Sequence, residues 1–164
     1  MHPAAYRFVA AIVSAGQVPP GLVVELGGRD VNGSIRGLFW GSYVSVDLAP
    51  GPGVDVVADA ATYTPPAPAA CVVCCEVLEH APTAPAIVAN AAAMLQPGGL
   101  LIVTAAGDGR APHSAVDGGP LRDGEYYANV TPGDVGGWCA GLEQVRVWTN
   151  RRAGDIYATA RKPA

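Results

Sequence analysis

The sequence predicts an α/β fold in which a seven-stranded, mostly parallel sheet carries helices on both faces and ends in an antiparallel hairpin. Apolar runs of strand length alternate with turns and helix-forming segments along the chain. The run at 22–26 (LVVEL) leads into glycines, and the run at 43–47 (YVSVD) ends on an acid about twenty residues later. This spacing is typical of the first strands of a Rossmann-like, nucleotide-binding sheet. Two alternating stretches at 143–149 and 155–161 predict the closing hairpin.

The size and composition of the chain predict a single globular domain over residues 1–164. A chain of this length buries roughly 70% of the surface that it exposes when unfolded. Half of the residues are hydrophobic and 15% are charged, which lies outside the range of disordered proteins. No run approaches the roughly 18 consecutive apolar residues that span a bilayer. We therefore expect a folded domain without membrane attachment, and the sequence carries no signal of its oligomeric state.

The charge of the chain argues against a nucleic-acid partner. The net charge is −4, and the ten Lys and Arg residues are scattered along the sequence. Proteins that bind a phosphate backbone usually gather a basic excess on one surface. A nucleic-acid substrate is therefore disfavoured.

The cysteines predict buried thiols and no metal site. Three of the four, Cys71, Cys74 and Cys75, lie in an apolar segment, and no second pair follows at the spacing of a zinc finger. Small buried thiols are typical of the reducing cytoplasm. The apolar stretch at 8–15 is short for a signal peptide and follows no basic cluster. We expect a cytoplasmic protein.

The first half of the chain predicts one helix and three strands. Pro3 is placed to open a helix, which carries apolar residues at helical spacing and ends before Pro19-Pro20-Gly21. This N-terminal segment, 1–20, is expected to lie on the sheet or over its mouth. Strands are expected at 22–26, 43–48 and 54–58, with only a brief crossover helix at 35–40.

The second half predicts a buried central strand and a long loop. The stretch at 70–76 (ACVVCCE) is almost uniformly apolar, as expected for a parallel strand covered on both faces. The segment 106–130 has no periodicity and greatly exceeds the usual connection of about 4–6 residues, which favours a functional, substrate-side loop. The remaining expected elements are a helix from 82 to 95 stopped by Gln96-Pro97-Gly98-Gly99, a strand at 100–105 and a capped helix from Thr131 to Cys139.

Four motifs along this order of elements resemble the class I S-adenosylmethionine-dependent methyltransferases. The motifs are ELGGR at 25–29, VDLAPGPGVDVVAD at 46–59, CCEVLEH at 74–80 and LQPGGLLIVTA at 95–105. Each motif is weak alone, and their combination is specific for the superfamily. The resemblance covers nearly the whole chain and implies S-adenosylmethionine as the cofactor.

The resemblance also implies a role for particular residues. Glu25 and the following glycines match the turn that lies against the methionine part of the cofactor. Asp47 matches the acid that accepts the ribose hydroxyls, and Asp59 matches the acid that takes the adenine amino group. The implied cofactor-binding residues are Glu25, Gly27, Gly28, Asp47, Leu48, Asp59, Ala60 and Cys75. Arg29 departs from the family pattern, because it stands where a second glycine is usual.

Three side chains are candidates for acid–base chemistry at the methyl acceptor. Glu76 and His80 follow the central strand together with Glu79, and His113 lies in the long loop near Asp117. The alternatives are that His80 caps or packs against the helix that begins near residue 82, and that His113 is an exposed loop histidine.

Two tyrosines of the long loop allow two interpretations. Tyr126 and Tyr127 either line a substrate pocket or anchor the loop to the core. The sequence does not distinguish between these roles.

The function that these observations favour is methyl transfer from S-adenosylmethionine to a small-molecule acceptor. Alternatives are a cofactor-binding module without turnover and a methyltransferase acting on a protein or nucleic acid. A nicotinamide-dependent oxidoreductase is disfavoured, because the turn after 22–26 lacks the GxGxxG cradle for a pyrophosphate.

Overall fold

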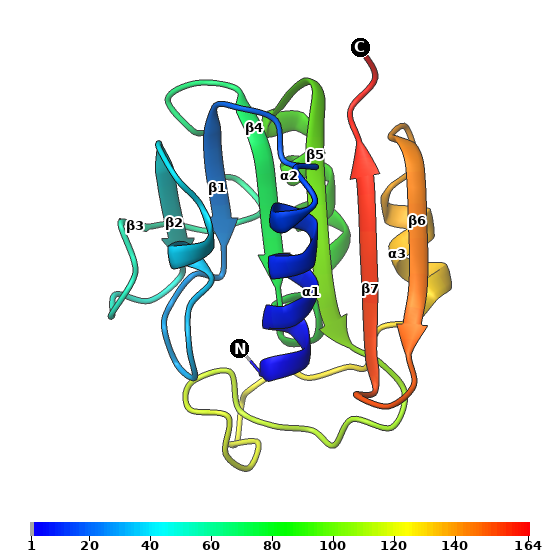
Figure 1. The fold of residues 1–164 in the computed structure, drawn as a ribbon. Helices are drawn as coiled ribbons and strands as arrows, with labels where there is room; N and C mark the ends of the chain where they lie inside the picture. Colours follow the sequence, from blue (N-terminus) through cyan, green and yellow to red (C-terminus); the bar gives the residue numbers. More distant parts are fainter. Residues whose placement is uncertain (1) are drawn as a thin grey trace.

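A central sheet lies between two helical layers in the computed structural model, which describes residues 2–164 (Figure 1). The strands are β1 (Leu22–Leu26), β2 (Tyr43–Asp47), β3 (Val56–Val57), β4 (Ala69–Cys75), β5 (Leu95–Ala106), β6 (Glu143–Asn150) and β7 (Asp155–Arg161). Their order in the sheet is β3-β2-β1-β4-β5-β7-β6. Neighbours are parallel from β3 to β5, whereas β7 runs antiparallel to β5 and β6. This confirms the predicted seven-stranded mixed sheet and its C-terminal hairpin.

The helices cover both faces of the sheet, as predicted. They are α1 (Pro3–Ser14), α2 (Ala84–Met94) and α3 (Pro132–Trp138), with single 3-10 turns at η1 (Arg36–Leu38) and η2 (Leu78–His80). Helix α1 lies on one face, and α2 and α3 lie on the other (Figure 1). Alternate residues of β1 therefore enter different cores: Val23 packs with α1 and Val24 packs with α2.

Strand β4 occupies the middle of the sheet, which explains its apolar sequence. All seven of its residues are buried, and it pairs in parallel with β1 and β5. The carboxyl ends of the parallel strands consequently meet at one edge of the sheet. In open α/β sheets this edge is where ligands bind.

Helix α1 begins at a cap that the sequence analysis did not include. The Nδ1 atom of His2 accepts a hydrogen bond from the backbone N–H of Ala4, at 3.3 Å, and Pro3 occupies the first helical turn. The helix ends before Gly16, whose φ of +65° is the left-handed conformation that glycine adopts without strain.

Strand β3 is shorter than the predicted 54–58. The carboxylate of Asp55 accepts the backbone N–H of Ser45 at 2.9 Å, so a side chain takes a ladder donor of β2. The same carboxylate pairs with Arg36 at 2.9 Å. A side chain thus takes one ladder donor, while the backbone bonds from Asp55 N–H to Ser45 O, at 3.0 Å, and from Ala58 N–H to Asp47 O, at 2.9 Å, remain.

Strand β5 begins at Leu95, five positions before the predicted start at 100. Leu95 pairs with Ala69, and the register between β4 and β5 shifts after this pair. The backbone N–H of Gly98 and the carbonyl of Gly99 both bond with Lys162, at 3.0 Å each. The predicted turn at 96–99 is thus an irregular start of the strand, where β4 and the C-terminal segment provide its partners.

Other boundaries move by one or two residues. Helix α2 begins at Ala84 rather than 82 and ends at Met94, β4 ends at Cys75 rather than Glu76, and β2 ends at Asp47.

Within residues 2–164, no helix combines the length and the apolar character needed to cross a membrane. The four cysteines are buried free thiols.

The long predicted loop crosses the carboxyl edge of the parallel strands (Figure 1). Residues 107–130, all of which the structure describes, form no helix or strand. The loop is held by the bonds Val130 N–H to Ala106 O, at 2.8 Å, and Ala128 N–H to Glu79 O, at 2.9 Å. Inside it, the Ser114 hydroxyl donates to Glu125 at 2.7 Å.

Candidate functional site

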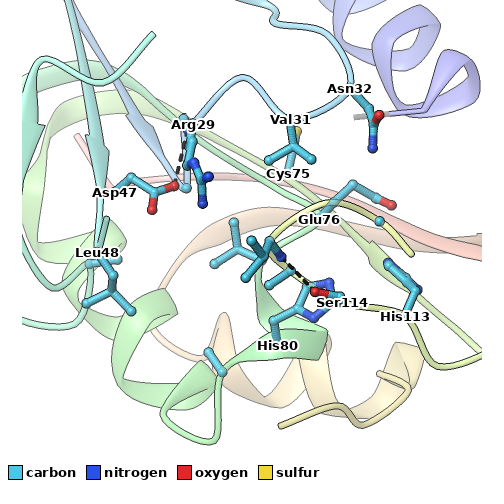
Figure 2. A pocket seen from close by; sticks show the side chains of 18 of the residues that line it. Arg29, Val31, Asn32, Asp47, Leu48, Cys75, Glu76, His80, His113 and Ser114 are labelled. Carbon is cyan, nitrogen blue, oxygen red and sulfur yellow. Dashed lines mark hydrogen bonds between the residues drawn. The ribbon is translucent and has the colours of Figure 1, made fainter. Parts of the chain in front are cut away.

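A pocket of about 970 Å³ lies between the long loop and the carboxyl ends of β1, β2 and β4 (Figure 2). Its volume is at the upper end of the range for small-molecule sites. Every site residue predicted from the sequence lines this pocket. These residues are Glu25, Gly27, Gly28, Asp47, Leu48, Asp59, Ala60, Cys75, Glu76, His80 and His113.

The glycine turn after β1 is required by the packing of the protein itself. Gly27 has a φ of +75°, and a Cβ atom there would lie 2.1 Å from Val77 Cγ2. A Cβ at Gly28 would lie 1.9 Å from Ser45 Oγ and 2.6 Å from Glu25 Oε2. Glycine at position 27 lets the turn pack against Val77, and glycine at position 28 lets the backbone approach the buried carboxylate of Glu25.

Glu25 is held by a partner that the sequence analysis missed. The carboxylate is 4% exposed and accepts a hydrogen bond from the Tyr43 hydroxyl at 2.7 Å. Burial raises the pKa of Glu25 above its usual value, and the bond from Tyr43 partly offsets this effect. Tyr43 is the first residue of β2 and belongs to no recognisable motif, so only the parallel pairing of β1 with β2 reveals the contact.

Asp47 stands at the end of β2 with its carboxylate oriented by the backbone. Its Oδ2 accepts the N–H of Arg29 at 3.2 Å, and its Oδ1 accepts the N–H of Ala49 at 3.1 Å. Each carboxylate oxygen has about two acceptor sites, so one on each oxygen is free for a ligand hydroxyl. Beside it, Leu48 is 73% exposed and offers an apolar surface at the rim.

Asp59 and Arg29 occupy the same end of the pocket as Asp47. Asp59 Oδ1 accepts the N–H of Ala61 at 2.8 Å, which fixes the turn after β3. Arg29, the departure from the family motif, places its side chain against Gly51: a Cβ on that glycine would lie 2.9 Å from Arg29 Nε. Arg29 thus contacts Asp47 through its backbone while its side chain packs along the neighbouring turn.

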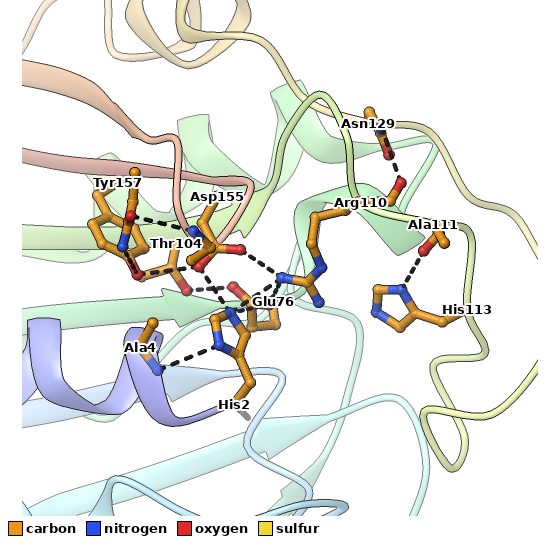
Figure 3. Close-up of polar contacts among 12 residues, drawn as sticks. His2, Ala4, Glu76, Thr104, Arg110, Ala111, His113, Asn129, Asp155 and Tyr157 are labelled. Carbon is orange, nitrogen blue, oxygen red and sulfur yellow. Dashed lines mark hydrogen bonds and ion pairs between the residues drawn. The ribbon is translucent and has the colours of Figure 1, made fainter.

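A charged cluster forms the wall behind Glu76 (Figure 3). Asp155 is fully buried and pairs with Arg110 at 2.5 Å and with His2 Nε2 at 2.8 Å. Glu76 accepts a hydrogen bond from the Thr104 hydroxyl at 2.9 Å and lies 3.5 Å from both Arg110 and His2. Glu76 has a φ of 57°, a conformation that non-glycine residues rarely adopt and that is common at functional sites.

The sequence analysis missed Arg110, Asp155 and His2 in this cluster. Arg110 lies in an aperiodic loop, and Asp155 is the first residue of the hairpin strand β7. Neither position belongs to a motif, and the contact joins segments that are 45 residues apart.

A second cluster combines both predicted histidines with Glu79. The rings of His80 and His113 lie 4.9 Å apart, and the ring of Tyr127 lies 5.4 and 5.0 Å from them. Burial, and then the neighbouring His113, lower the pKa of His80 to about 4. Burial, and then the charge of Glu76, raise the pKa of Glu79.

Three expectations for the loop residues can now be compared with the structure. Asp117 does not support His113: it pairs with Arg122 and accepts the N–H of Gly119 at 2.9 Å. Tyr126 is 44% exposed and lies outside the pocket lining, whereas Tyr127 packs on the two imidazoles as an anchor. His113 is half-buried against His80 rather than free in solvent.

No family model and no curated protein matches this chain. Many solved structures, in contrast, are similar to this chain. A 1,6-didemethyltoxoflavin-N1-methyltransferase from Burkholderia thailandensis is 18% identical, with a TM-score of 0.67 over 98% of this chain and 79% of that one. An amino pentose methyltransferase from Micromonospora echinaspora is 16% identical, with a TM-score of 0.70 over 97% and 90%.

A third match is the N-methyltransferase NodS from Bradyrhizobium japonicum. It is 13% identical, with a TM-score of 0.63 over 99% of this chain and 98% of that one. The first structure contains S-adenosylhomocysteine and the second contains S-adenosylmethionine. At these identities the similarity establishes the fold, and the chain has the fold of the class I methyltransferases, as the sequence motifs predicted.

Proposed function

We propose that this protein is an S-adenosylmethionine-dependent methyltransferase that acts on a small-molecule acceptor. The observation that carries the proposal is the position of Asp47, Asp59 and the turn at Gly27-Gly28 around one pocket, at the strand ends of this fold. Similar structures that hold S-adenosylmethionine or S-adenosylhomocysteine support the same conclusion.

The residues present suit each part of the cofactor. Asp47 has free acceptor sites for the two ribose hydroxyls, and exposed Leu48 offers an apolar surface for the adenine ring. Asp59 and Ala60 lie beside it for the adenine amino group. Gly27 and Gly28 let the backbone approach the methionine portion, with Glu25 behind them. A pocket of about 970 Å³ leaves room for an acceptor as well.

The chemistry requires placement more than acid–base strength. When bound, the cofactor supplies a methyl group already activated on a sulfonium. The protein then has to hold the acceptor atom in line, and positioning of this kind contributes about 7–11 kcal/mol in well-oriented systems. Cys75 and Glu76, at the end of β4, line the pocket where the acceptor is expected.

Within the proposal, the acceptor binds on the side of the pocket that carries Glu76, His80 and His113, across from Asp47 (Figure 2). Glu76, His80 and His113 are the titratable side chains of the pocket lining that face the proton of the acceptor. The loop 107–130 covers this side and excludes water from the reacting groups.

Calorimetric titration with S-adenosylmethionine, S-adenosylhomocysteine and NAD tests the cofactor assignment. We expect the first two to bind and NAD not to bind, and binding of NAD alone would refute the proposal. Transfer of a labelled methyl group onto pools of metabolites, proteins and nucleic acids then tests the substrate class. Label in the metabolite fraction supports a small-molecule acceptor, whereas tight cofactor binding without any transfer indicates a binding module.

A further inference from the structure

Glu79 is a buried carboxylate without a partner. Its side chain is 0% exposed, and neither carboxylate oxygen has a hydrogen-bond partner among the described residues. The backbone N–H groups of Glu79 and Ala106 lie near the carboxylate, but neither makes a hydrogen bond of normal geometry with it. Burying an unpaired charged carboxylate is very costly, so such a group is either protonated or bound to a cation.

The side chain of Arg110 does not serve as this cation. Its guanidinium lies 2.5 Å from Asp155 and 3.5 Å from Glu76, in the neighbouring cluster (Figure 3). That cluster also joins His2, Glu76 and Asp155 in a set of metal-ligating residue types. Arg110 supplies its positive charge to that cluster, whereas no cation among the described residues forms an ion pair with Glu79.

Two imidazoles surround the unpartnered carboxylate. One ligand atom from each of Glu79, His80 and His113 lies within 4.8 Å of the others. The Nδ1 atom of His80 is buried and also has no partner among the described residues. The chain contains three histidines, and two of them meet here although they are 33 positions apart (113 − 80).

His113 is oriented as a metal ligand would be. Its Nδ1 atom lies 3.0 Å from the carbonyl of Ala111, which can only accept, so Nδ1 carries the proton (Figure 3). The lone pair is then on Nε2. Metal-ligating histidines commonly donate their other N–H to a backbone carbonyl in this way, which fixes both tautomer and ring orientation.

We propose that Glu79, His80 and His113 bind a divalent transition-metal ion in the wall of the pocket. Two imidazole nitrogens and one carboxylate suit Zn²⁺, Mn²⁺, Fe²⁺ or Co²⁺, whereas Mg²⁺ and Ca²⁺ prefer oxygen ligands throughout. Three protein ligands leave coordination positions open for water or substrate. His80 and His113 both line the pocket, so the ion faces the acceptor side.

This position gives the ion a role in the reaction, a step that rests on the proposed function. An ion in contact with an acceptor hydroxyl lowers the pKa of that hydroxyl, so its proton leaves to solvent or to a nearby base without a strong base from the protein. His80 and His113 then act as ligands rather than as proton acceptors. The acceptor class is accordingly an oxygen-bearing small molecule.

Metal titration of untagged protein, stripped with a chelator and dialysed, tests the site. Zn²⁺ is followed by calorimetry and Co²⁺ by its visible absorption. We expect one ion per chain, and we expect Glu79→Gln and His113→Ala each to weaken binding at least tenfold. His2→Gln is the matched control, because it removes the third histidine and should leave metal affinity unchanged. Circular dichroism and thermal unfolding report whether each variant is folded.

The inference is overturned if stripped wild-type protein takes up well under one ion per chain, or if both variants bind as wild type does. Glu79 would then be a protonated buried carboxyl group. Since Glu79→Gln alters the core, His113→Ala in the half-exposed loop keeps the test decisive should the first variant not fold. Titrating S-adenosylmethionine into the same samples separates the two proposals: cofactor binding without metal binding refutes only this one, and metal binding without cofactor binding refutes only the proposed function.

Discussion

Asp47 is the residue whose proposed role is easiest to isolate. Its carboxylate also accepts hydrogen bonds from two backbone N–H groups, so thermal unfolding of each variant checks that the strand end stays in place. Asp47→Ala removes charge-assisted hydrogen bonds to the ribose, and we expect S-adenosylmethionine affinity to fall by about 1–3 kcal/mol, roughly 5- to 150-fold. Calorimetry measures the change, and exposed Asp123→Ala, outside the pocket, is the control. Unchanged affinity in Asp47→Ala would mean that the ribose lies elsewhere.

Gly28 provides a second test at the residue scale. An added Cβ would lie 1.9 Å from Ser45 Oγ and 2.6 Å from Glu25 Oε2, so Gly28→Ala must displace a buried hydrogen-bonded carboxylate. We expect a loss of about 1–3 kcal/mol in unfolding free energy, measured by urea denaturation, together with weaker cofactor binding. Gly37→Ala should be tolerated, because nothing lies within 4 Å of a Cβ at that position. Equal stability of the two variants would show that the turn yields easily.

The cofactor-binding residues predicted from the sequence are those whose position depends on a strand end. Glu25, Asp47 and Asp59 each follow an apolar run, and parallel pairing alone brings such positions to one edge. Arg110 and Asp155 meet through a loop and a hairpin start, and no periodicity encodes that contact. The three proposed metal ligands were all named from the sequence, but as acid–base candidates and not as a metal site. The sequence analysis considered cysteines, whereas the proposed ligands come from η2 and an aperiodic loop.

Helix α3 shows the importance of a cap at the scale of an element. The helix has only seven residues, and two of the residues after its first turn are glycines, which have a low helix propensity. Thr131 accepts the N–H of Asp134 at 3.1 Å, and Asp134 accepts the N–H of Thr131 at 2.9 Å. Thr131→Ala should therefore lower the unfolding free energy by about 1 kcal/mol in urea denaturation. An effect near zero would mean that packing of Val135 alone holds the helix.

The same cap predicts a pH dependence. Hydrogen bonds from Thr131 lower the pKa of Asp134 below its usual value of 3.8. The native state then binds fewer protons than the unfolded state, so the contribution of Asp134 is present above pH 3.8 and is lost as the pH falls through the lowered pKa. The stability difference between wild type and Asp134→Asn should shrink as urea denaturation is repeated from pH 7 down to this range. A constant difference would contradict the assignment.

The buried strand β4 was predicted well, whereas the bounds of β3 and the start of β5 were not. Strand β4 is buried along its whole length, and its apolar run marked both its type and its central position. At the edge, β3 shortened because the carboxylate of Asp55 takes a ladder donor, a competition that propensity does not register. β5 started early because β4 and Lys162 provide partners for residues that would form a turn in isolation.

At the scale of the whole molecule, the site joins a rigid edge and a loop without regular structure. The cofactor side stands on strand ends of the sheet, and the acceptor side depends on loop 107–130, which is attached by few backbone bonds. Alternating patterns and four motifs sufficed to predict the sheet. The conformation of the loop arises from side-chain contacts such as Ser114 with Glu125, which have no sequence period.

The contrast between the strand-end side and the loop side of the site predicts how the molecule responds to bound cofactor product. S-adenosylhomocysteine at about 100 times its dissociation constant should stabilise the native state by about 2.7 kcal/mol and raise the melting temperature by roughly 5–10 °C. The shift should be smaller in Asp47→Ala at the same concentration, and NAD should produce none. Hydrogen exchange should show new protection at the ends of β1 and β2, because those backbone groups contact the ligand directly. Loop 107–130 should change less, since its residues face the acceptor, and its full protection by S-adenosylhomocysteine alone would mean that the loop closes on the cofactor rather than on the substrate.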